Sequence, residues 1–366
     1  MRCLSLPLAA LALACSSALA NGFVATPLVT DNPLANPGQI TDAGLLNGWG
    51  IAYSATSPFW VSSNGAGTST LYRVDPLTDV TTKQGLTVSI PGAGNVTGQV
   101  FNGNAAAFNG NAFLFASEDG TVSGWRSALG TQAERLVVGL PDNVYKGVAL
   151  GSMGGNSYLY AANFATGNVD VLKGSSGAPN LTGQFTDPNL PAGYAPFNVQ
   201  NLGGTLYVAY AQQDAAHRDE TAGAGLGVVD RFDLNGNLLA RVAGGGPLNA
   251  PWGLAIAPSS FGAMAGDLLV GNFGDGRINV YGASGLVGQV LGPDDLPLVI
   301  DGLWALTPGN GGGAGAAGKL YFSAGPGDEA HGLFGVLNVS AVPEPGSAWM
   351  WLGGVALLAG AMKRRR

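Results

Sequence analysis

Four polar residues in this sequence follow short apolar runs and carry side chains that bind cations. Glu118 follows FLFAS, Asn163 follows LYAA, and Asn272 follows LLVG, with Asp275 a little further on. Carboxylate and amide oxygens are the ligands of Ca²⁺, so these side chains would make a Ca²⁺ site if the fold brought them together. Asn and Asp at such positions also cap turns by bonding to their own backbone. Both interpretations stay open at this point.

Other chemistry is sparse. His217 and His331 lack the spacing of paired zinc ligands. His331 lies beside Asp328 and Glu329, which predicts either a carboxylate–histidine pair or a plain turn. The sequence has no GxSxG nucleophile elbow, no phosphate-binding loop, and no GxGxxG motif placed between a strand and a helix. Pairs of carboxylates from different repeats remain open as acid–base candidates, but nothing singles out two of them.

Short strands must position these residues. The stretch 250–284 holds three β-prone runs bounded by Gly, Asn, Asp or Pro, as in antiparallel strands joined by tight turns. Similar stretches align at Trp49, Phe101, Gly147, Phe197, Trp252 and Trp304. A period of about 50 residues with three or four strands per copy is typical of propeller blades. We therefore predict an all-β, six-bladed β-propeller; a solenoid, the alternative, would need shorter repeats and caps.

One strand stands outside the repeats. Phe23–Thr30 precedes the first copy, and the sixth copy ends near Val339. We expect this strand to supply the outer strand of the last blade, which would close the ring and remove free edges. Equivalent turns of all blades would then converge on one face near the axis. The recurring aromatic residues at the start of the copies are expected to pack between blades.

The N-terminus predicts export. Residues 1–20 combine Arg2, an apolar run and Ala18-Leu19-Ala20, which is typical of a signal peptide cleaved before Asn21. Cys15 as a lipoprotein attachment site is the weaker alternative. Both cysteines lie in this segment, so the exported chain, with its propeller over 21–341, is expected to lack thiols.

The charge balance argues against nucleic acid. The chain has 16 Lys and Arg against 23 Asp and Glu, and five of the basic residues lie in the two terminal segments. A phosphate-binding surface needs clustered basic residues in the folded part of the chain. We therefore expect no nucleic-acid partner.

The tail, residues 342–366, carries the most specific motif. Pro343-Glu344-Pro345 is followed by an apolar run over 347–362 and then by Lys363 and the cluster Arg364, Arg365 and Arg366. The run is near the short limit for a transmembrane helix, and the basic cluster would stay cytoplasmic. This order resembles the PEP-CTERM sorting signal. The resemblance implies recognition by an exosortase, transient inner-membrane anchoring by the C-terminal span, and a destination in the cell envelope, at the cell surface or in the extracellular matrix. A permanent tail anchor is the alternative.

The body also resembles known proteins. Segments such as NGWGIA, FLFASEDGTVSGW, NAPWGLAIAP and LLVGNFGDGRINVY are similar to those of uncharacterised exported bacterial proteins, and in style to NHL-like and gluconolactonase-like six-bladed propellers. The resemblance implies fold and compartment. The metal-binding residues of lactonases cannot be carried over to particular positions of this sequence.

Two functions of different classes follow. The first is a non-enzymatic binding or structural propeller associated with exopolysaccharide or envelope proteins, reaching its place through the secretion machinery and an exosortase. The second is a Ca²⁺-dependent, lactonase-like hydrolase with a central pocket that uses Glu118, Asn163, Asn272 or Asp275. The sparse catalytic inventory favours the first, for which no cofactor is predicted.

Overall fold

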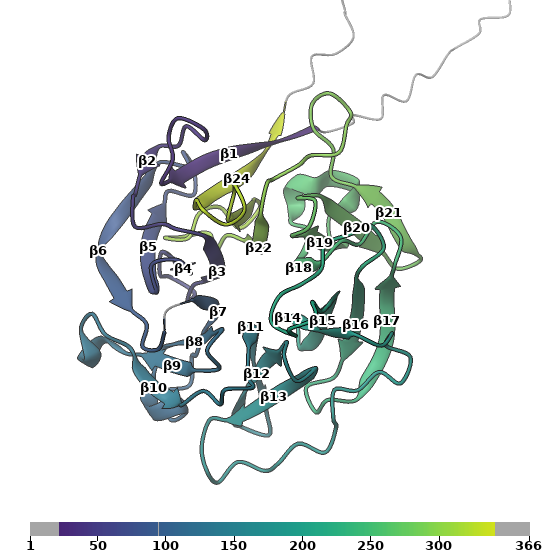
Figure 1. Ribbon diagram of the computed structural model, residues 1–366. Helices are drawn as coiled ribbons and strands as arrows, with labels where there is room; N and C mark the ends of the chain where they lie inside the picture. The colour runs from purple at the N-terminus through teal and green to yellow at the C-terminus, as the bar shows by residue number, and fades with distance from the viewer. Residues whose placement is uncertain (1–21, 94, 341–366) are drawn as a thin grey trace, which may run out of the picture.

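The structure, a computed structural model, describes residues 22–340 except 94 and arranges them as six β-sheets around one axis (Figure 1). The predicted signal peptide, and the sorting tail with its predicted transmembrane helix, lie outside the described residues. Within the described part, helix is limited to three short 3₁₀ segments: Phe108–Gly110, Ser127–Leu129 and Ser259–Met264. No helix in that part is long and apolar enough to span a bilayer. The predicted all-β, six-bladed propeller is confirmed.

The first three blades follow the chain from the axis outward. Blade 1 contains β3 (Gly48–Ala52), β4 (Phe59–Ser63), β5 (Thr68–Val74) and β6 (Thr81–Ser89). Blade 2 contains β7 (Val96–Phe101), β8 (Phe113–Ser117), β9 (Val122–Trp125) and β10 (Glu134–Val137). Blade 3 has three strands, β11 (Tyr145–Met153), β12 (Asn156–Asn163) and β13 (Asn168–Lys173).

The other three blades complete the circle. Blade 4 contains β14 (Tyr194–Leu202), β15 (Thr205–Gln212), β16 (Val228–Phe232) and β17 (Leu238–Gly244). Blade 5 contains β18 (Pro251–Ile256), β19 (Leu268–Asn272), β20 (Ile278–Gly282) and β21 (Gly285–Gln289). Blade 6 contains β22 (Leu303–Pro308), β23 (Leu320–Ala324), β24 (Leu333–Ser340), β1 (Gly22–Thr30) and the short β2 (Ile40–Thr41).

The second strand of a blade explains why the sequence shows short apolar runs with little alternation. Every residue of β4, β8, β19 and β23 is buried. Neighbouring blades cover both faces of each sheet, so both sets of side chains in these strands must be apolar or small. Runs such as FWVSS and FLFAS satisfy that demand.

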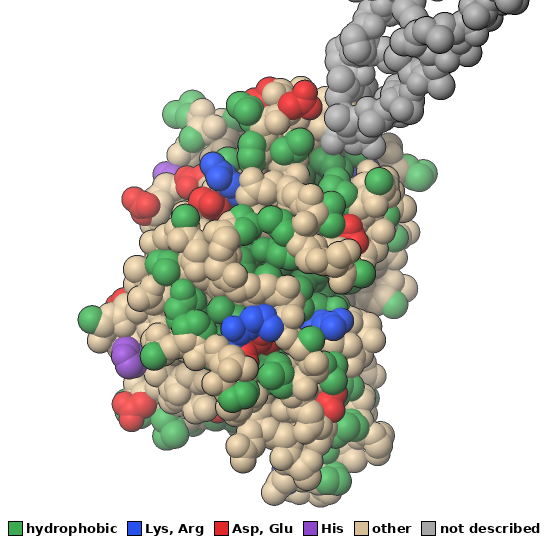
Figure 2. All heavy atoms as spheres, turned by 90° about the vertical axis from the view of Figure 1, so that its right-hand side faces the viewer, with side chains coloured by type: hydrophobic (Ala, Val, Ile, Leu, Met, Phe, Trp, Pro, Cys, Tyr) green, Lys and Arg blue, Asp and Glu red, His purple; other side chains and the backbone are tan. Residues whose placement is uncertain are grey.

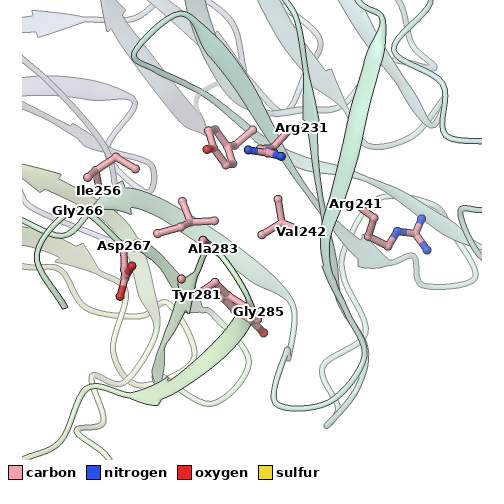
Figure 3. Close-up of a pocket in the computed structure, with 12 residues that line it drawn as sticks. Arg231, Arg241, Val242, Ile256, Gly266, Asp267, Tyr281, Ala283 and Gly285 are labelled. Atoms are coloured by element: carbon pink, nitrogen blue, oxygen red, sulfur yellow. The ribbon is translucent and has the colours of Figure 1, made fainter. Parts of the chain in front are cut away.

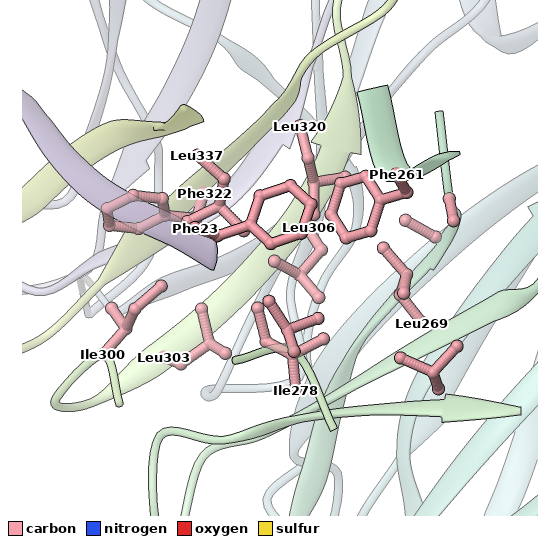
Figure 4. Close-up of a cluster of buried hydrophobic side chains, with 14 of the residues drawn as sticks. Phe23, Phe261, Leu269, Ile278, Ile300, Leu303, Leu306, Leu320, Phe322 and Leu337 are labelled. Carbon is pink, nitrogen blue, oxygen red and sulfur yellow. The ribbon is translucent and has the colours of Figure 1, made fainter. Parts of the chain in front are cut away.

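The ring closes through the N-terminal strand. β1 pairs antiparallel with β24 from Gly22↔Ser340 to Thr30↔Leu333, so the predicted closure of the last blade is confirmed. Phe23 stacks on Phe261 of the neighbouring blade with ring centroids 4.4 Å apart, inside the apolar cluster between blades 5 and 6 (Figure 4). Closure by a strand from the other end of the chain covers the outer edge of β24.

The pairing of each innermost strand shifts register near the start of the strand. Such a β-bulge changes the direction in which the residue at that position points. The six residues at these positions form what we call the axial ring: Trp49, Thr97, Lys146, Phe197, Trp252 and Trp304. The alignment predicted from the sequence is wrong for blade 2, where Phe101 is the last residue of β7. Thr97 of blade 2 and Lys146 of blade 3 lack the aromatic side chain of the other four copies, and in blade 2 the alignment took Phe101 as its start instead.

Side chains tie neighbouring innermost strands together. Thr97 Oγ1 donates to the carbonyl of Tyr145 over 2.7 Å, which joins blades 2 and 3. Gln99 Nε2 donates to the carbonyl of Gly50 over 2.7 Å, which joins blades 2 and 1. These bonds satisfy buried polar atoms and fix the distance between blades.

Candidate functional site at the axis

Lys146 is the charged member of the axial ring. Its side chain is 2% exposed, and its Nζ lies 2.5 Å from Glu118 Oε1 and 2.8 Å from Asp219 Oδ1. The ammonium also lies 5.4 Å from the centroid of the Trp49 ring, at cation–π distance. Burial alone would lower the pKa of Lys146, but Glu118, Asp219 and Glu220 outweigh burial and raise it above its ordinary value. The amine is therefore held as an ammonium ion and is not available as a nucleophile.

Two further carboxylates face the same ammonium. Burial raises the pKa of Glu220 to about 7, against the opposing effect of Lys146. Burial also raises the pKa of Glu329, again opposed by Lys146. One cation therefore stands among four acidic side chains from blades 2, 4 and 6. We call Lys146 and these four carboxylates the ionic end of the axis.

A loop of blade 4 covers the ionic end. Residues 213–221 form a polar segment between β15 and β16, and residues 215–219 within it are exposed. This capping loop is folded back on itself by the bridge Gln213↔Glu220. Gln213 Nε2 donates to the carbonyl of Phe164 in blade 3, and Arg218 Nη2 lies 3.5 Å from the carbonyl oxygen of Glu118 in blade 2. The loop thus brings Asp219 across to the lysine of another blade.

A chain of amides continues from the ionic end around the ring. Asn64 Nδ2 donates to Glu118 Oε2 over 3.2 Å, and Asn47 Nδ2 lies 3.4 Å from Asn64 Oδ1. Asn47 Oδ1 in turn accepts from Trp304 Nε1 over 2.8 Å. Trp304 stacks on Trp49 with centroids 3.6 Å apart. Blades 6, 1, 2 and 3 are therefore connected through one polar and aromatic network.

Asn163 lies in a turn of its own blade. Its Nδ2 donates to Asp170 Oδ2 over 2.8 Å and to Asn143 Oδ1 over 3.0 Å. Its Oδ1 accepts from the backbone N–H of Val144 over 3.3 Å. Asn163 Oδ1 also accepts from the backbone N–H of Thr166 over 3.4 Å, which is the contact of a residue that caps a turn.

Asn272 and Asp275 form a second such turn in blade 5. Asn272 Nδ2 donates to Asp275 Oδ1 over 2.9 Å and to the carbonyl of Pro247 over 2.8 Å. Asp275 Oδ1 also accepts from the backbone N–H of Arg277. Of the four residues singled out in the sequence, Glu118 is the one that contacts Lys146. The prediction that all four form one axial ligand set stays a prediction.

The donor set at the ionic end does not fit a resident Ca²⁺. The ammonium of Lys146 already occupies the place between Glu118 and Asp219 that a cation would take, and a second positive charge there would be repelled. Among residues 22–340 apart from 94, no group of three or more His, Cys, Asp or Glu is arranged to hold a metal ion.

His331 pairs with a residue that its sequence neighbours did not suggest. Its Nδ1 lies 2.8 Å from Asp31 Oδ2, and its Nε2 lies 3.1 Å from Asn32 Nδ2. The pairing of β1 with β24 brings these residues together from opposite ends of the chain. Asp328 and Glu329 instead adopt positive φ, which is typical of a turn.

The opposite end of the axis is open and uncharged. Here the innermost strands of five blades line a cavity of about 400 Å³ without a charged side chain. Its polar groups belong to Tyr53, Gln99, Gln200, Asn201 and Thr307, and the rest of its lining is apolar. We call this cavity the open end.

Sequence reasoning missed Lys146 and the open end. The signal for Lys146 was present, because YKGV aligns with GWGI and PWGL and places a lysine where other copies carry tryptophan. The open end had no comparable signal. Its lining comes from many blades and consists of residue types that are ordinary in strands.

Two viral proteins are similar to this chain over most of its length. Uncharacterized protein R648 of Acanthamoeba polyphaga mimivirus is 32% identical over 289 residues, which cover 75% of this chain and 71% of the relative. Uncharacterized protein L690 of the same virus is 32% identical over 320 residues, covering 81% of each chain. The chain belongs to the family of these proteins.

The tail and the propeller each resemble other proteins. Residues 341–366 match the PEP-CTERM protein-sorting motif, which implies recognition by an exosortase and sorting to the cell surface. A solved structure of a putative gluconolactonase aligns with a TM-score of 0.45 and 19% identity over 66% of this chain and 78% of that chain. A likeness this distant carries no argument about activity.

Proposed function

We propose that this protein is an exported, surface-sorted β-propeller that binds exopolysaccharide and has a structural rather than catalytic role. In this proposal residues 1–20 are a signal peptide, 21–341 form the propeller, and 342–366 are the sorting signal with a transient membrane span. The match of residues 341–366 to the sorting motif supports the destination.

The observation that carries the choice of binding over hydrolysis is the ion pair of Lys146 with Glu118. A hydrolase at this end would need free carboxylates or a metal ion to polarise its substrate. Here the chain's own ammonium neutralises Glu118, and the capping loop brings Asp219 over the lysine. A Ca²⁺ titration by calorimetry tests this point, because one tight site would favour the lactonase-like alternative.

Sorting is tested in the producing cells. Replacing Pro343, Glu344 and Pro345 with alanine should leave the protein in the membrane fraction at its unprocessed mass. The unaltered protein should be found in the surface or matrix fraction, shortened at its C-terminus. Val342→Ala, next to the motif, is the matched control and should sort normally. Equal distribution of all three proteins would contradict the proposal.

A further inference from the structure

Three polar residues form a row across the sheet of blade 4. Gln200 on β14 is the direct cross-strand partner of Tyr207 on β15, and Tyr207 is the partner of Arg231 on β16. Direct partners project from the same face of a sheet. The next residue, Asn201, donates to the carbonyl of Leu150 in blade 3 over 2.8 Å. Because side chains alternate along a strand, Gln200, Tyr207 and Arg231 lie on the face toward blade 5.

The row leads from the axis into a second cavity. Gln200 lines the open end, whereas Tyr207 and Arg231 line a cleft of about 250 Å³ between blades 4 and 5 (Figure 3). Asp267 and Tyr281 form part of the wall that blade 5 contributes to this cleft. With neighbouring strands about 5 Å apart, the row is about 10 Å long, enough for more than one sugar ring.

Four polar side chains along this path are left without a bond to the described part of the protein itself, although others at the open end, such as Gln99 and Asn201, are bonded. Within residues 22–340 apart from 94, the side chains of Gln200, Tyr207, Arg231 and Asp267 make no hydrogen bond to another protein atom. Arg241, on the same cleft, is different: it points away from the cavity in Figure 3 and pairs with Asp187 and Asp230. Arg241 is therefore held by two carboxylates of the protein, whereas the Arg231 guanidinium is available to a ligand.

The chemistry of the path selects an uncharged, hydroxyl-rich ligand. The open end carries no charged side chain, and in the cleft the positive charge of Arg231 is matched by Asp267. On the side of the molecule shown in Figure 2, acidic and basic side chains are interspersed among uncharged ones, so neither sign of charge dominates. The half-buried ring of Tyr207 offers a flat apolar surface with a polar edge, while the Gln200 amide, the Arg231 guanidinium and the Asp267 carboxylate can bond to hydroxyl groups.

We propose that the open end and this cleft form one binding groove for a neutral polysaccharide chain, with Gln200, Tyr207 and Arg231 as its contact row. This deepens the proposed function, on which it rests, by naming the class of saccharide and the residues that hold it. The groove lies on the face opposite the ionic end, so the two ends of the axis have separate roles.

The test is affinity gel electrophoresis of the exported protein through gels containing one polymer each. Dextran and hydroxyethyl cellulose are the neutral probes, alginate is the acidic probe, and polysaccharide extracted from the producer's own matrix is the fourth. We expect retardation by a neutral probe that persists at high salt, because no ion pairs are needed. Tyr207→Ala should weaken that binding by about tenfold or more, as for a central aromatic contact. Gln200→Ala and Arg231→Ala should weaken it less.

Arg73→Ala is the matched control. Arg73 lies on β5, the third strand of blade 1, as Arg231 lies on the third strand of blade 4, and it is likewise exposed. The control should bind as tightly as the unaltered protein, and thermal melts should show that all variants are folded. Tyr207→Phe, which keeps the ring, should retain most of the affinity.

The outcomes separate this inference from the proposed function. Binding that is equal in Tyr207→Ala and Arg73→Ala would overturn the groove and leave exopolysaccharide binding intact. Retardation by alginate alone, lost at high salt, would overturn the neutral class of ligand. Failure to bind the producer's own polysaccharide would overturn the proposed function itself.

Discussion

The two ends of the propeller axis differ in charge: one holds a lysine among four carboxylates, and the other has no charged side chain in its lining. At the ionic end, the ammonium of Lys146 contacts two carboxylates and the capping loop folds over it. At the open end no side chain is charged. Tyr53, Gln99 and Asn201 donate to backbone carbonyls, whereas the Gln200 side chain makes no hydrogen bond to a protein atom within the described residues. Buried charge must be paired to be tolerated, whereas unpaired neutral groups next to a cavity remain free for a ligand. We therefore infer that the ionic end stabilises the fold and that the open end binds a ligand.

The largest expected effect comes from removing the cation of the ionic end. Lys146→Met leaves Glu118, Asp219, Glu220 and Glu329 facing one another without their partner. Removing one partner of a buried ion pair typically costs about 3–5 kcal/mol of the free energy of unfolding. Urea unfolding should show that loss at neutral pH. Lys173→Met in the same blade, where the lysine is exposed, should change stability by less than about 0.5 kcal/mol. Equal stability of the two variants would contradict the structural role of Lys146.

The second prediction concerns the pH dependence that the ionic end imposes. The pKa of Glu220 is raised to about 7 in the folded protein from its ordinary value of 4.5. A raised carboxyl pKa contributes stability below pH 4.5, and this contribution is lost as the pH rises through about 7. Glu220→Gln should therefore flatten the fall in melting temperature over that window. We expect a gain of about 1 kcal/mol at pH 8, after allowing for the partial exposure of the side chain.

A contrary result would be equally informative. If Glu220→Gln lowers stability at pH 8, the Glu220 carboxylate attracts Lys146 more strongly than burial opposes its ionisation. Glu329→Gln serves as the companion variant, because burial also raises the pKa of Glu329. Its melting temperature should shift in the same direction as that of Glu220→Gln.

The smallest effect is expected at the surface of the ionic end. The Asp219 side chain is 69% exposed, whereas that of Glu118 is 18% exposed, although both contact Lys146. Solvent screens the exposed pair, so Asp219→Asn should cost only a few tenths of a kcal/mol. Glu118→Gln should cost more, and a double-mutant cycle with Lys146→Met would measure both pairs. A larger coupling for Asp219 would show that the capping loop excludes water more fully than its exposure indicates.

The fold could be predicted from the sequence because residues that are close together in the sequence determine its strands, turns and repeat length. Short apolar runs, tight-turn residues and a period of about 50 residues define the blades, and the unpaired strand at Phe23–Thr30 needed a partner that β24 supplies. The three-stranded blade 3 was harder to foresee. The segment after Lys173 reads much like other loops, and it forms no fourth strand.

The site was predicted in part, because its contacts join residues that are distant in sequence. Glu118 was singled out, but its partner Lys146 lies 28 residues away, and Asp219 lies 73 residues beyond that lysine. Such contacts form because turns of different blades meet at the axis, and the sequence alone does not show which turns will meet. The contact row of Gln200, Tyr207 and Arg231 depends on strand register. A shift of one residue in a strand would turn its side chains to the other face of the sheet and break the row.

The most direct test of this division of roles compares one variant from each end in the same binding experiment. Glu118→Gln perturbs the ionic end while keeping an oxygen that accepts from Lys146, and Tyr207→Ala perturbs the groove. Their dissociation constants for the neutral polymer that retards the unaltered protein should diverge. We predict that Glu118→Gln binds as the unaltered protein does and melts at a lower temperature, while Tyr207→Ala stays folded at the assay temperature and binds about tenfold more weakly. Loss of binding in Glu118→Gln with full binding in Tyr207→Ala would contradict the account.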